Sequence, residues 1–228
     1  MRLSLNGVAN ILLTASAVAV AAAAVRKNST TSRARDSSPA NSAPRYIADW
    51  QDIAAQGHLI GDAAAPVKVM EFADLECPYC RQFHEQYVRD FGRNSKDVAL
   101  IYVHYPLRMH RFARPAARAA ECAGAQGRFG QFEGAVYDRQ DSLGLKTWSS
   151  YARDAGVADT IAFTRCASDT SRVDRIERGL AAGNHLAISG TPTLLINGWL
   201  YPMVPFDSLP QLVAQFRAGH APTDKETR

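Results

Sequence analysis

The chain has 228 residues, a length that favours one folded domain with room for an insertion. Hydrophobic residues make up 46% of it and charged residues 21%, as in an ordinary globular protein. Residues 1–45 hold six of the 26 basic and one of the 22 acidic residues, so the other 183 residues carry 20 basic and 21 acidic groups. The body has no cationic excess and no nucleic-acid-binding motif, which argues against a nucleic-acid partner.

The N-terminus contains an uncharged stretch from Leu3 to Val25 that follows a basic residue and ends in small residues. This pattern is typical of a secretory signal or a signal anchor, and 23 residues are enough to span a bilayer. We expect residues 1–25 to act as an uncleaved anchor. Cleavage near Ala24 and a buried helix remain as alternatives. The predicted location is therefore outside the cytoplasm, in the periplasm or cell envelope.

Residues 26–45 are rich in Ser, Thr, Arg, Ala and Pro and lack apolar periodicity, which predicts a disordered linker. The folded domain is expected over residues 46–220, with a polar tail at 221–228. It begins with "YIADWQDIAAQG", where apolar residues at helical spacing end at a glycine.

The first recognisable unit is a strand, a cysteine pair, a helix and a second strand. Residues 67–72 form a buried apolar run, "PYCRQFHEQYVRDFG" has the helical period, and "DVALIYVHYPL" is rich in β-formers. This βαβ pattern places Cys77 and Cys80 at the N-terminus of the connecting helix.

Residues 111–187 show helical patterns with almost no strand candidates, so we predict a helical insertion there. The runs "SGTPTLLING" and "WLYPMVP" then flank Asn197-Gly198, a strong hairpin signal. A last helix is expected over about residues 207–218. The predicted order is βαβ, a helical block and ββα.

This order resembles the thioredoxin fold with an inserted helical domain, an α/β fold with a central mixed sheet flanked by helices. The motifs "GDAAAPVKVMEFADLECPYC" and "GTPTLLING" resemble the DsbA-like thiol:disulfide oxidoreductases of the bacterial cell envelope, over roughly residues 57–218. The resemblance implies that the CPYC pair exchanges disulfides with cysteine-containing exported proteins. It also implies a membrane redox partner if the protein is an oxidase. No metal and no organic cofactor is implied.

A redox dithiol needs one thiol that ionises readily and a second within reach. At a helix N-terminus, unpaired backbone N–H groups and the helix dipole favour the thiolate. We therefore predict that Cys77 is the exposed nucleophile and Cys80 the resolving thiol. An inert disulfide and a zinc site remain as alternatives, although Cys122 and Cys166 lack the close spacing of a second zinc-binding pair.

The resemblance assigns further site residues. In the family the Thr191-Pro192 bond is cis and lies against the cysteine pair, so the Thr191 backbone would pair with an extended substrate. An ordinary trans turn proline is the alternative for Pro192. Glu71 matches the family's buried acid, six residues before Cys77, and would exchange a proton with Cys80. A solvent-facing strand residue is the alternative for Glu71.

Tyr79 lies between the two cysteines and is expected to contact substrate. The family's most oxidising members have a histidine at this place. Because a tyrosine ring cannot carry a positive charge, we expect the reduced form to be less stabilised here. His84 follows Cys80 by one helical turn, which allows a position near the site or on an outer helix face.

The four cysteines of an exported chain indicate a second disulfide. We predict a structural bridge between Cys122 and Cys166, with an accessory redox pair and free buried thiols as alternatives. The expected function is a monomeric oxidase. A cell-envelope reductase or isomerase and a non-catalytic peptide-binding chaperone on the same fold are the alternatives. The linker is too short and polar to supply the dimerisation module that an isomerase usually needs.

Overall fold

The computed structural model describes residues 43–92, 95–201 and 206–222 of the chain. The predicted anchor lies outside these residues, as do most of the predicted linker and tail. Within the described part, no helix has both the length and the apolar character needed to cross a membrane.

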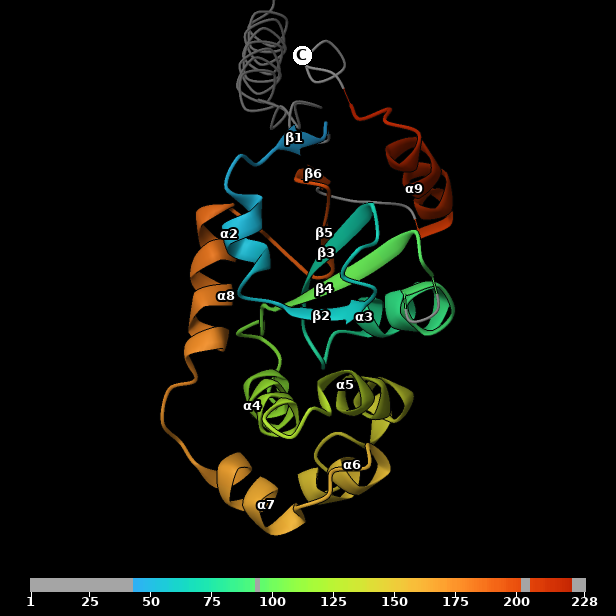
Figure 1. Ribbon diagram of the computed structural model, residues 1–228. Coiled ribbons are helices and arrows are strands. Elements are labelled where there is room, and N and C mark those ends of the chain that lie inside the picture. The colour runs from blue at the N-terminus through green and yellow to red at the C-terminus, as the bar shows by residue number, and fades with distance from the viewer. Residues whose placement is uncertain (1–42, 93–94, 202–205, 223–228) are drawn as a thin grey trace, which may run out of the picture. The chain divides into compact units, whose positions relative to one another are not determined.

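Six strands form one mixed sheet in the order β1-β6-β5-β3-β4-β2, with helices on both sides (Figure 1). Only β3 and β4 pair in parallel, and the other neighbouring strands in this sheet are antiparallel. The strands are β1 (Arg45–Tyr46), β2 (His58–Gly61), β3 (Val67–Ala73), β4 (Val98–His104), β5 (Thr193–Ile196) and β6 (Trp199–Tyr201).

The helices fall into a group that covers the sheet and a group that forms the insertion (Figure 1). The first group is α2 (Trp50–Ala54), α3 (Pro78–Phe83) with its π-helical continuation (His84–Gly92), α8 (Asp174–His185) and α9 (Leu209–Arg217). The second group is α4 (Ala113–Gly124), α5 (Phe129–Asp138), α6 (Trp148–Asp154) and α7 (Thr160–Ser168). Short 3-10 turns lie at Gln140–Ser142 and Phe206–Ser208. Although α8 falls in the predicted helical block, it returns to the sheet beside α2 (Figure 1).

The two faces of β3 enter different parts of the core, as alternation along a strand requires. Met70 and Phe72 pack with residues of α2 and α8, while Val69 and Ala73 belong to the cluster that contains the CPYC cysteines. Glu71 lies between Val69 and Ala73 in sequence and therefore shares their face. This parity places a carboxyl group on the cysteine side of the sheet.

The predicted hairpin is confirmed as β5 and β6. Its turn residues Asn197 and Gly198 have φ values of 46° and 89°, and positive φ at both positions is the pattern of a type I′ turn. The edge strand β2 was missed from the sequence, because its four residues are too few for a periodic signal. The pairing of β2 with β4 brings Gly57, the residue before β2, close to β4. A Cβ atom at position 57 would lie 2.5 Å from Cγ2 of Ile101, so a side chain does not fit at this position.

Candidate active site

Cys77 is the N-cap residue of α3, with extended backbone angles, and Pro78 is the first residue of that helix. Proline suits this position because the first helical N–H has no partner within the helix. The backbone N–H of Arg81 donates to the carbonyl oxygen of Cys77 at 3.1 Å, which closes the first turn with Cys80 inside it. Both cysteines therefore lie at the N-terminus of a helix, as predicted.

Cys77 is not exposed, which corrects the sequence prediction. Both thiols are free, and Cys77 has only 3% of its surface accessible. Its sulfur donates a hydrogen bond to the carbonyl oxygen of Thr191 at 3.1 Å, and its own carbonyl oxygen accepts one from Gln140 Nε2 at 3.0 Å. Segments from two other parts of the chain therefore cover the nucleophile, and a strand–helix pattern cannot reveal them.

The Thr191-Pro192 peptide bond is cis, as the resemblance implies. Thr191 is itself buried, directly before β5, with its carbonyl oxygen facing the Cys77 sulfur. Tyr79, in contrast, has 64% of its surface exposed beside the buried pair. The site thus combines a covered thiol, a neighbouring backbone segment and a projecting aromatic ring.

The two thiols have opposite acidities. Hydrogen bonds from the Cys80 thiol and from the backbone N–H groups of Cys80 and Tyr79 lower the pKa of Cys77 to about 6, although burial opposes this. Burial, followed by the hydrogen bond to Cys77 and the negative charge of Glu71, raises the pKa of Cys80 well above its usual range. At neutral pH the thiolate therefore belongs to Cys77 and the remaining proton to Cys80.

Glu71 is buried, with 1% of its surface accessible, so the solvent-facing alternative is wrong. Burial, then the negative charge of Glu133, raises its pKa well above the usual value, against the hydrogen bond with the Cys80 thiol. Its Oε1 atom has no hydrogen-bond partner among the described residues. A carboxyl group with a raised pKa thus lies beside the inner thiol, which is the position of a proton donor or acceptor.

His84 lies in the core and not on an outer helix face. Its Nδ1 lies 2.7 Å from Oε1 of Glu133, and both side chains are buried. Glu133 belongs to α5 of the insertion, and its charge reaches Glu71. The helical spacing of Cys80 and His84 is visible in the sequence and allowed a position of His84 near the site. No pattern in the sequence indicates that Glu133 lies beside it.

Asp74 holds the loop that leads into the CPYC pair, and the sequence analysis missed it. Its Oδ1 accepts the backbone N–H of Glu76 at 2.8 Å, and its Oδ2 accepts that of Leu107 at 2.8 Å. The Nδ1 atom of His110 lies 2.7 Å from the same Oδ2. The buried carboxylate therefore ties the cysteine loop to the segment after β4.

Gln140 holds the same loop from the insertion. Its Nε2 atom donates to the carbonyl oxygens of Leu75 at 2.9 Å and Cys77 at 3.0 Å. The Tyr137 hydroxyl also lies 3.4 Å from the carbonyl oxygen of Asp74. The helical insertion therefore helps to shape the site, a role that only the folded chain makes visible.

Cys122 and Cys166 form a disulfide between α4 and α7, across 44 positions of sequence. This bond involves neither Cys77 nor Cys80, which are both free. The structure thus places the second cysteine pair where a structural bridge was predicted, inside the insertion.

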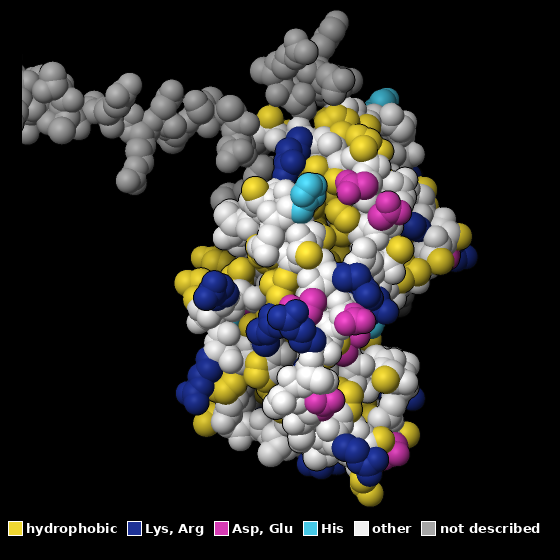
Figure 2. All heavy atoms as spheres, turned by 90° about the vertical axis from the view of Figure 1, so that its left-hand side faces the viewer, with side chains coloured by type: hydrophobic (Ala, Val, Ile, Leu, Met, Phe, Trp, Pro, Cys, Tyr) yellow, Lys and Arg dark blue, Asp and Glu magenta, His cyan; other side chains and the backbone are white. Residues whose placement is uncertain are grey.

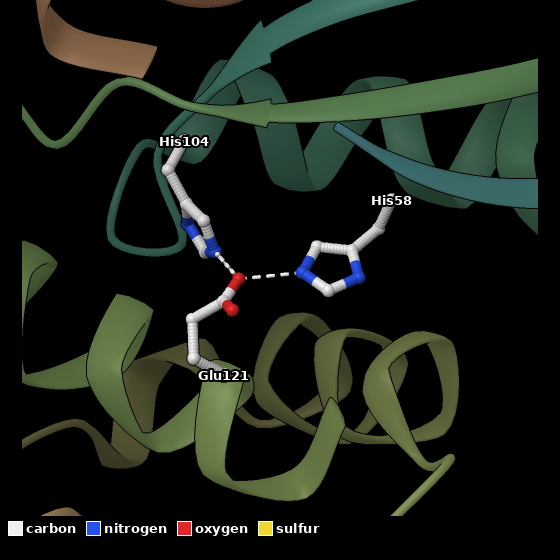
Figure 3. Close-up of side chains that lie close together, drawn as sticks. All are labelled: His58, His104 and Glu121. Atoms are coloured by element: carbon white, nitrogen blue, oxygen red, sulfur yellow. Dashed lines mark hydrogen bonds and ion pairs between the residues drawn. The ribbon is translucent and has the colours of Figure 1, made fainter. Parts of the chain in front are cut away.

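In the described part of the chain, the side chains that could together hold a metal ion are His58, His104 and Glu121 (Figure 3). No cysteine belongs to this group. Charges of both signs are interspersed on the side that carries α2 and α8 (Figure 2), in agreement with the near-zero net charge of the body.

Comparison with known proteins places this geometry in a family. A family model described as thioredoxin matches residues 54–214. A thioredoxin-like oxidoreductase from Silicibacter pomeroyi has 26% identity and a TM-score of 0.63, over 77% of this chain and 99% of that one. DsbA2 from Pseudomonas aeruginosa has 28% identity and a TM-score of 0.52, over 69% of this chain and 92% of that one. The predicted fold class and the resemblance to DsbA-like proteins are confirmed.

A curated relative, Na(+)/H(+) antiporter NhaA 3 from Salinispora tropica, is 36% identical over 142 residues. The match covers 62% of this chain but only 22% of the antiporter. The chain therefore spans about a fifth of that relative, whose name describes the longer protein.

Proposed function

This chain belongs to the thioredoxin family, and we propose that it is a DsbA-like thiol:disulfide oxidoreductase that works as an oxidase through Cys77 and Cys80. The observation that carries the proposal is the position of Cys77 at the N-cap of α3, with its sulfur 3.1 Å from the carbonyl oxygen of Thr191 before a cis proline. The pKa of Cys77, lowered to about 6 beside a Cys80 whose pKa is raised, agrees with this position. At pH 7 such a Cys77 is about ten times more often thiolate than thiol. This stabilises the dithiol by about 1.4 kcal/mol, or ~30 mV, and so favours oxidation of the substrate.

Disulfide transfer to a substrate proceeds in two exchanges. A substrate thiolate attacks the Cys77 sulfur of the oxidised protein, the Cys77–Cys80 bond breaks, and the Cys80 thiolate takes the proton of Glu71. A second substrate thiolate then attacks the substrate sulfur of the mixed disulfide, which forms the substrate disulfide and releases the Cys77 thiolate. Two electrons pass from the substrate to the protein, and the low pKa of Cys77 makes it a good leaving group.

The substrates are cysteine-containing exported proteins in extended conformation. The Thr191 backbone next to Cys77 supports this, because a strand can pair with backbone groups there by β-augmentation. Tyr79, which is exposed and lies between the two cysteines in the sequence, offers an aromatic contact. The protein acts as a monomer outside the cytoplasm, anchored by residues 3–25, and a membrane redox partner takes up its electrons.

The reduction potential of the Cys77–Cys80 couple, measured against glutathione, tests the direction of transfer. An oxidase requires a potential well above the roughly −270 mV of a reductant. Because position 79 is a tyrosine and not a histidine, we expect the potential of this protein to lie below the roughly −120 mV of the strongest oxidants. The purified protein should reactivate reduced ribonuclease and be slow in insulin reduction. A potential near that of thioredoxin with rapid insulin reduction would make it a reductase, and inactivity in both assays would favour the chaperone alternative.

A further inference from the structure

We propose that His58, His104 and Glu121 form a binding site for one divalent transition-metal ion such as zinc. When bound, the ion joins the helical insertion to the edge of the sheet. The Nε2 atoms of His58 and His104 lie 2.5 Å and 2.9 Å from the same Oε1 atom of Glu121. Figure 3 shows both imidazoles turned from the sheet toward the carboxylate. Two imidazole nitrogens and one carboxylate oxygen are a ligand set that zinc accepts, with water in the fourth position.

The three ligands come from separate elements that the fold holds in register. His58 begins β2 and His104 ends β4, and the pairing of His58 with Tyr102 makes the two histidines diagonal neighbours on these antiparallel strands. Glu121 projects from α4, one residue before the disulfide-bonded Cys122. The ring of His58 is further fixed by stacking on Phe129, with centroids 3.5 Å apart.

The surroundings of the Glu121 carboxylate resemble those of a carboxylate that binds a metal ion. Arg175 Nε lies 3.4 Å from the other oxygen of Glu121, and its Nη1 donates to the carbonyl oxygens of Gln56 and Gly57. Such an outer partner orients a ligating carboxylate, and here it leaves Oε1 directed at the two imidazoles. The side chains of His58 and Glu121 are 18% and 17% exposed, while His104 is buried, so the site opens to solvent on one side.

Entry of the ion requires a small movement. Zinc bonds of about 2.1 Å place tetrahedral ligands ~3.4 Å apart, more than the present separations from Glu121 Oε1. The long side chain of Glu121 can supply this opening by withdrawing its oxygen from the two rings. The competing explanation is a network of hydrogen bonds between two imidazoles and a carboxylate, without an ion.

Zinc titration of the oxidised protein separates these explanations, because the Cys77–Cys80 disulfide then removes the thiolates as ligands. The full chain is freed of metal with a chelator and titrated with ZnCl₂ by calorimetry, and its melting temperature is followed in parallel. We expect one zinc ion per chain with a Kd in the micromolar range or tighter. At about 100 times Kd, the melting temperature should rise by roughly 5–10 °C.

Two variants assign the binding to these ligands. His58→Asn and Glu121→Gln should weaken zinc binding at least tenfold and abolish the thermal shift, and the melting temperature without metal shows that each variant is folded. The control His185→Asn changes an exposed histidine of α8 and should bind zinc as the wild type does. Absence of zinc binding to the wild type, or equal binding by His58→Asn and the wild type, would overturn the proposal in favour of the hydrogen-bond network.

Discussion

The sulfur of Cys77 lies 3.1 Å from the carbonyl oxygen of Thr191, a residue 114 positions further along the chain. In the thiol form Cys77 donates a hydrogen bond to this oxygen. When Cys77 ionises, this donor is lost. In the proposed mode of substrate binding, the carbonyl oxygen then becomes available to a backbone N–H of an extended substrate, so ionisation of Cys77 and substrate binding are coupled at one contact.

The two cysteines should have separate roles in substrate exchange. Cys77→Ser should abolish disulfide transfer, because it removes the thiolate at the helix N-terminus. Cys80→Ser should accumulate mixed disulfides with substrate, because no resolving thiol remains. Non-reducing gels and mass spectrometry of trapped species measure both effects, and preferential alkylation of Cys80 in the reduced wild type at pH 7 would reverse the assignment.

The acidity of Cys77 should depend on Cys80. The hydrogen bond from the Cys80 thiol is the largest contribution that lowers the pKa of Cys77 to about 6. Cys80→Ala should therefore move the midpoint of iodoacetamide alkylation from near pH 6 upward toward the usual value of about 8.5. A midpoint that stays near 6 would assign the low pKa to the helix N-terminus alone.

Glu71→Gln should stabilise the protein increasingly as the pH rises. The pKa of Glu71 is raised, so the folded state holds its proton more tightly than the unfolded state does. The wild type consequently loses stability above about pH 4, by about 1.4 kcal/mol for each pKa unit of the shift once the carboxyl is ionised. Thermal melts of the oxidised proteins should show a gap that widens from pH 4 to pH 7.

Asp49→Asn, which changes an exposed carboxylate, is the control for that series and should show no such trend. In disulfide exchange, Glu71→Gln should slow turnover at neutral pH, because the Cys80 thiolate loses its proton donor. A turnover rate that does not change across the pH range would exclude proton exchange by Glu71.

Gln140→Leu should disturb the cysteine loop. It leaves the carbonyl oxygen of Leu75 without its donor, at a cost of roughly 1–3 kcal/mol. It also removes one of the two donors to the carbonyl oxygen of Cys77, which keeps the N–H of Arg81. We expect a lower melting temperature and a raised pKa of Cys77, because the backbone N–H groups that face the sulfur are then less well held. Alkylation rates against pH measure the second effect.

Gln126→Leu is a matched control for Gln140→Leu. Gln126 also lies in the insertion and hydrogen-bonds to the backbone, donating to the carbonyl oxygen of Asp159 at 2.9 Å. It should lower the melting temperature without moving the pKa of Cys77. Equal effects of the two substitutions on Cys77 would mean that the insertion acts by stability alone.

Removal of the second disulfide should affect stability and not the redox couple. Closing a loop across 44 positions stabilises the chain by roughly 4 kcal/mol in the chain-entropy model. Cys122→Ala with Cys166→Ala should thus lower the melting temperature by roughly 8–16 °C, since about 1 kcal/mol corresponds to 2–4 °C at this size. The potential of the Cys77–Cys80 couple should stay unchanged, and a shifted potential would indicate a redox relay.

The sequence by itself determined the elements whose signals are local. The apolar run of β3, the cysteines at the start of α3 and the Asn197-Gly198 hairpin follow from side-chain periodicity and turn chemistry within a few residues. The spacing of Glu71 from Cys77 could also be recognised, because strand parity sets the face on which the carboxyl lies.

Only the tertiary structure decided what surrounds these elements. The sulfur of Cys77 contacts Thr191 in the loop before β5. The insertion reaches the same part of the chain through two hydrogen bonds, from Gln140 to the carbonyl oxygen of Cys77 and between His84 and Glu133. His58, His104 and Glu121 likewise meet from three separate elements. Such contacts leave no periodic trace in one sequence, because they depend on how helices dock against the sheet and not on the preference of any single segment.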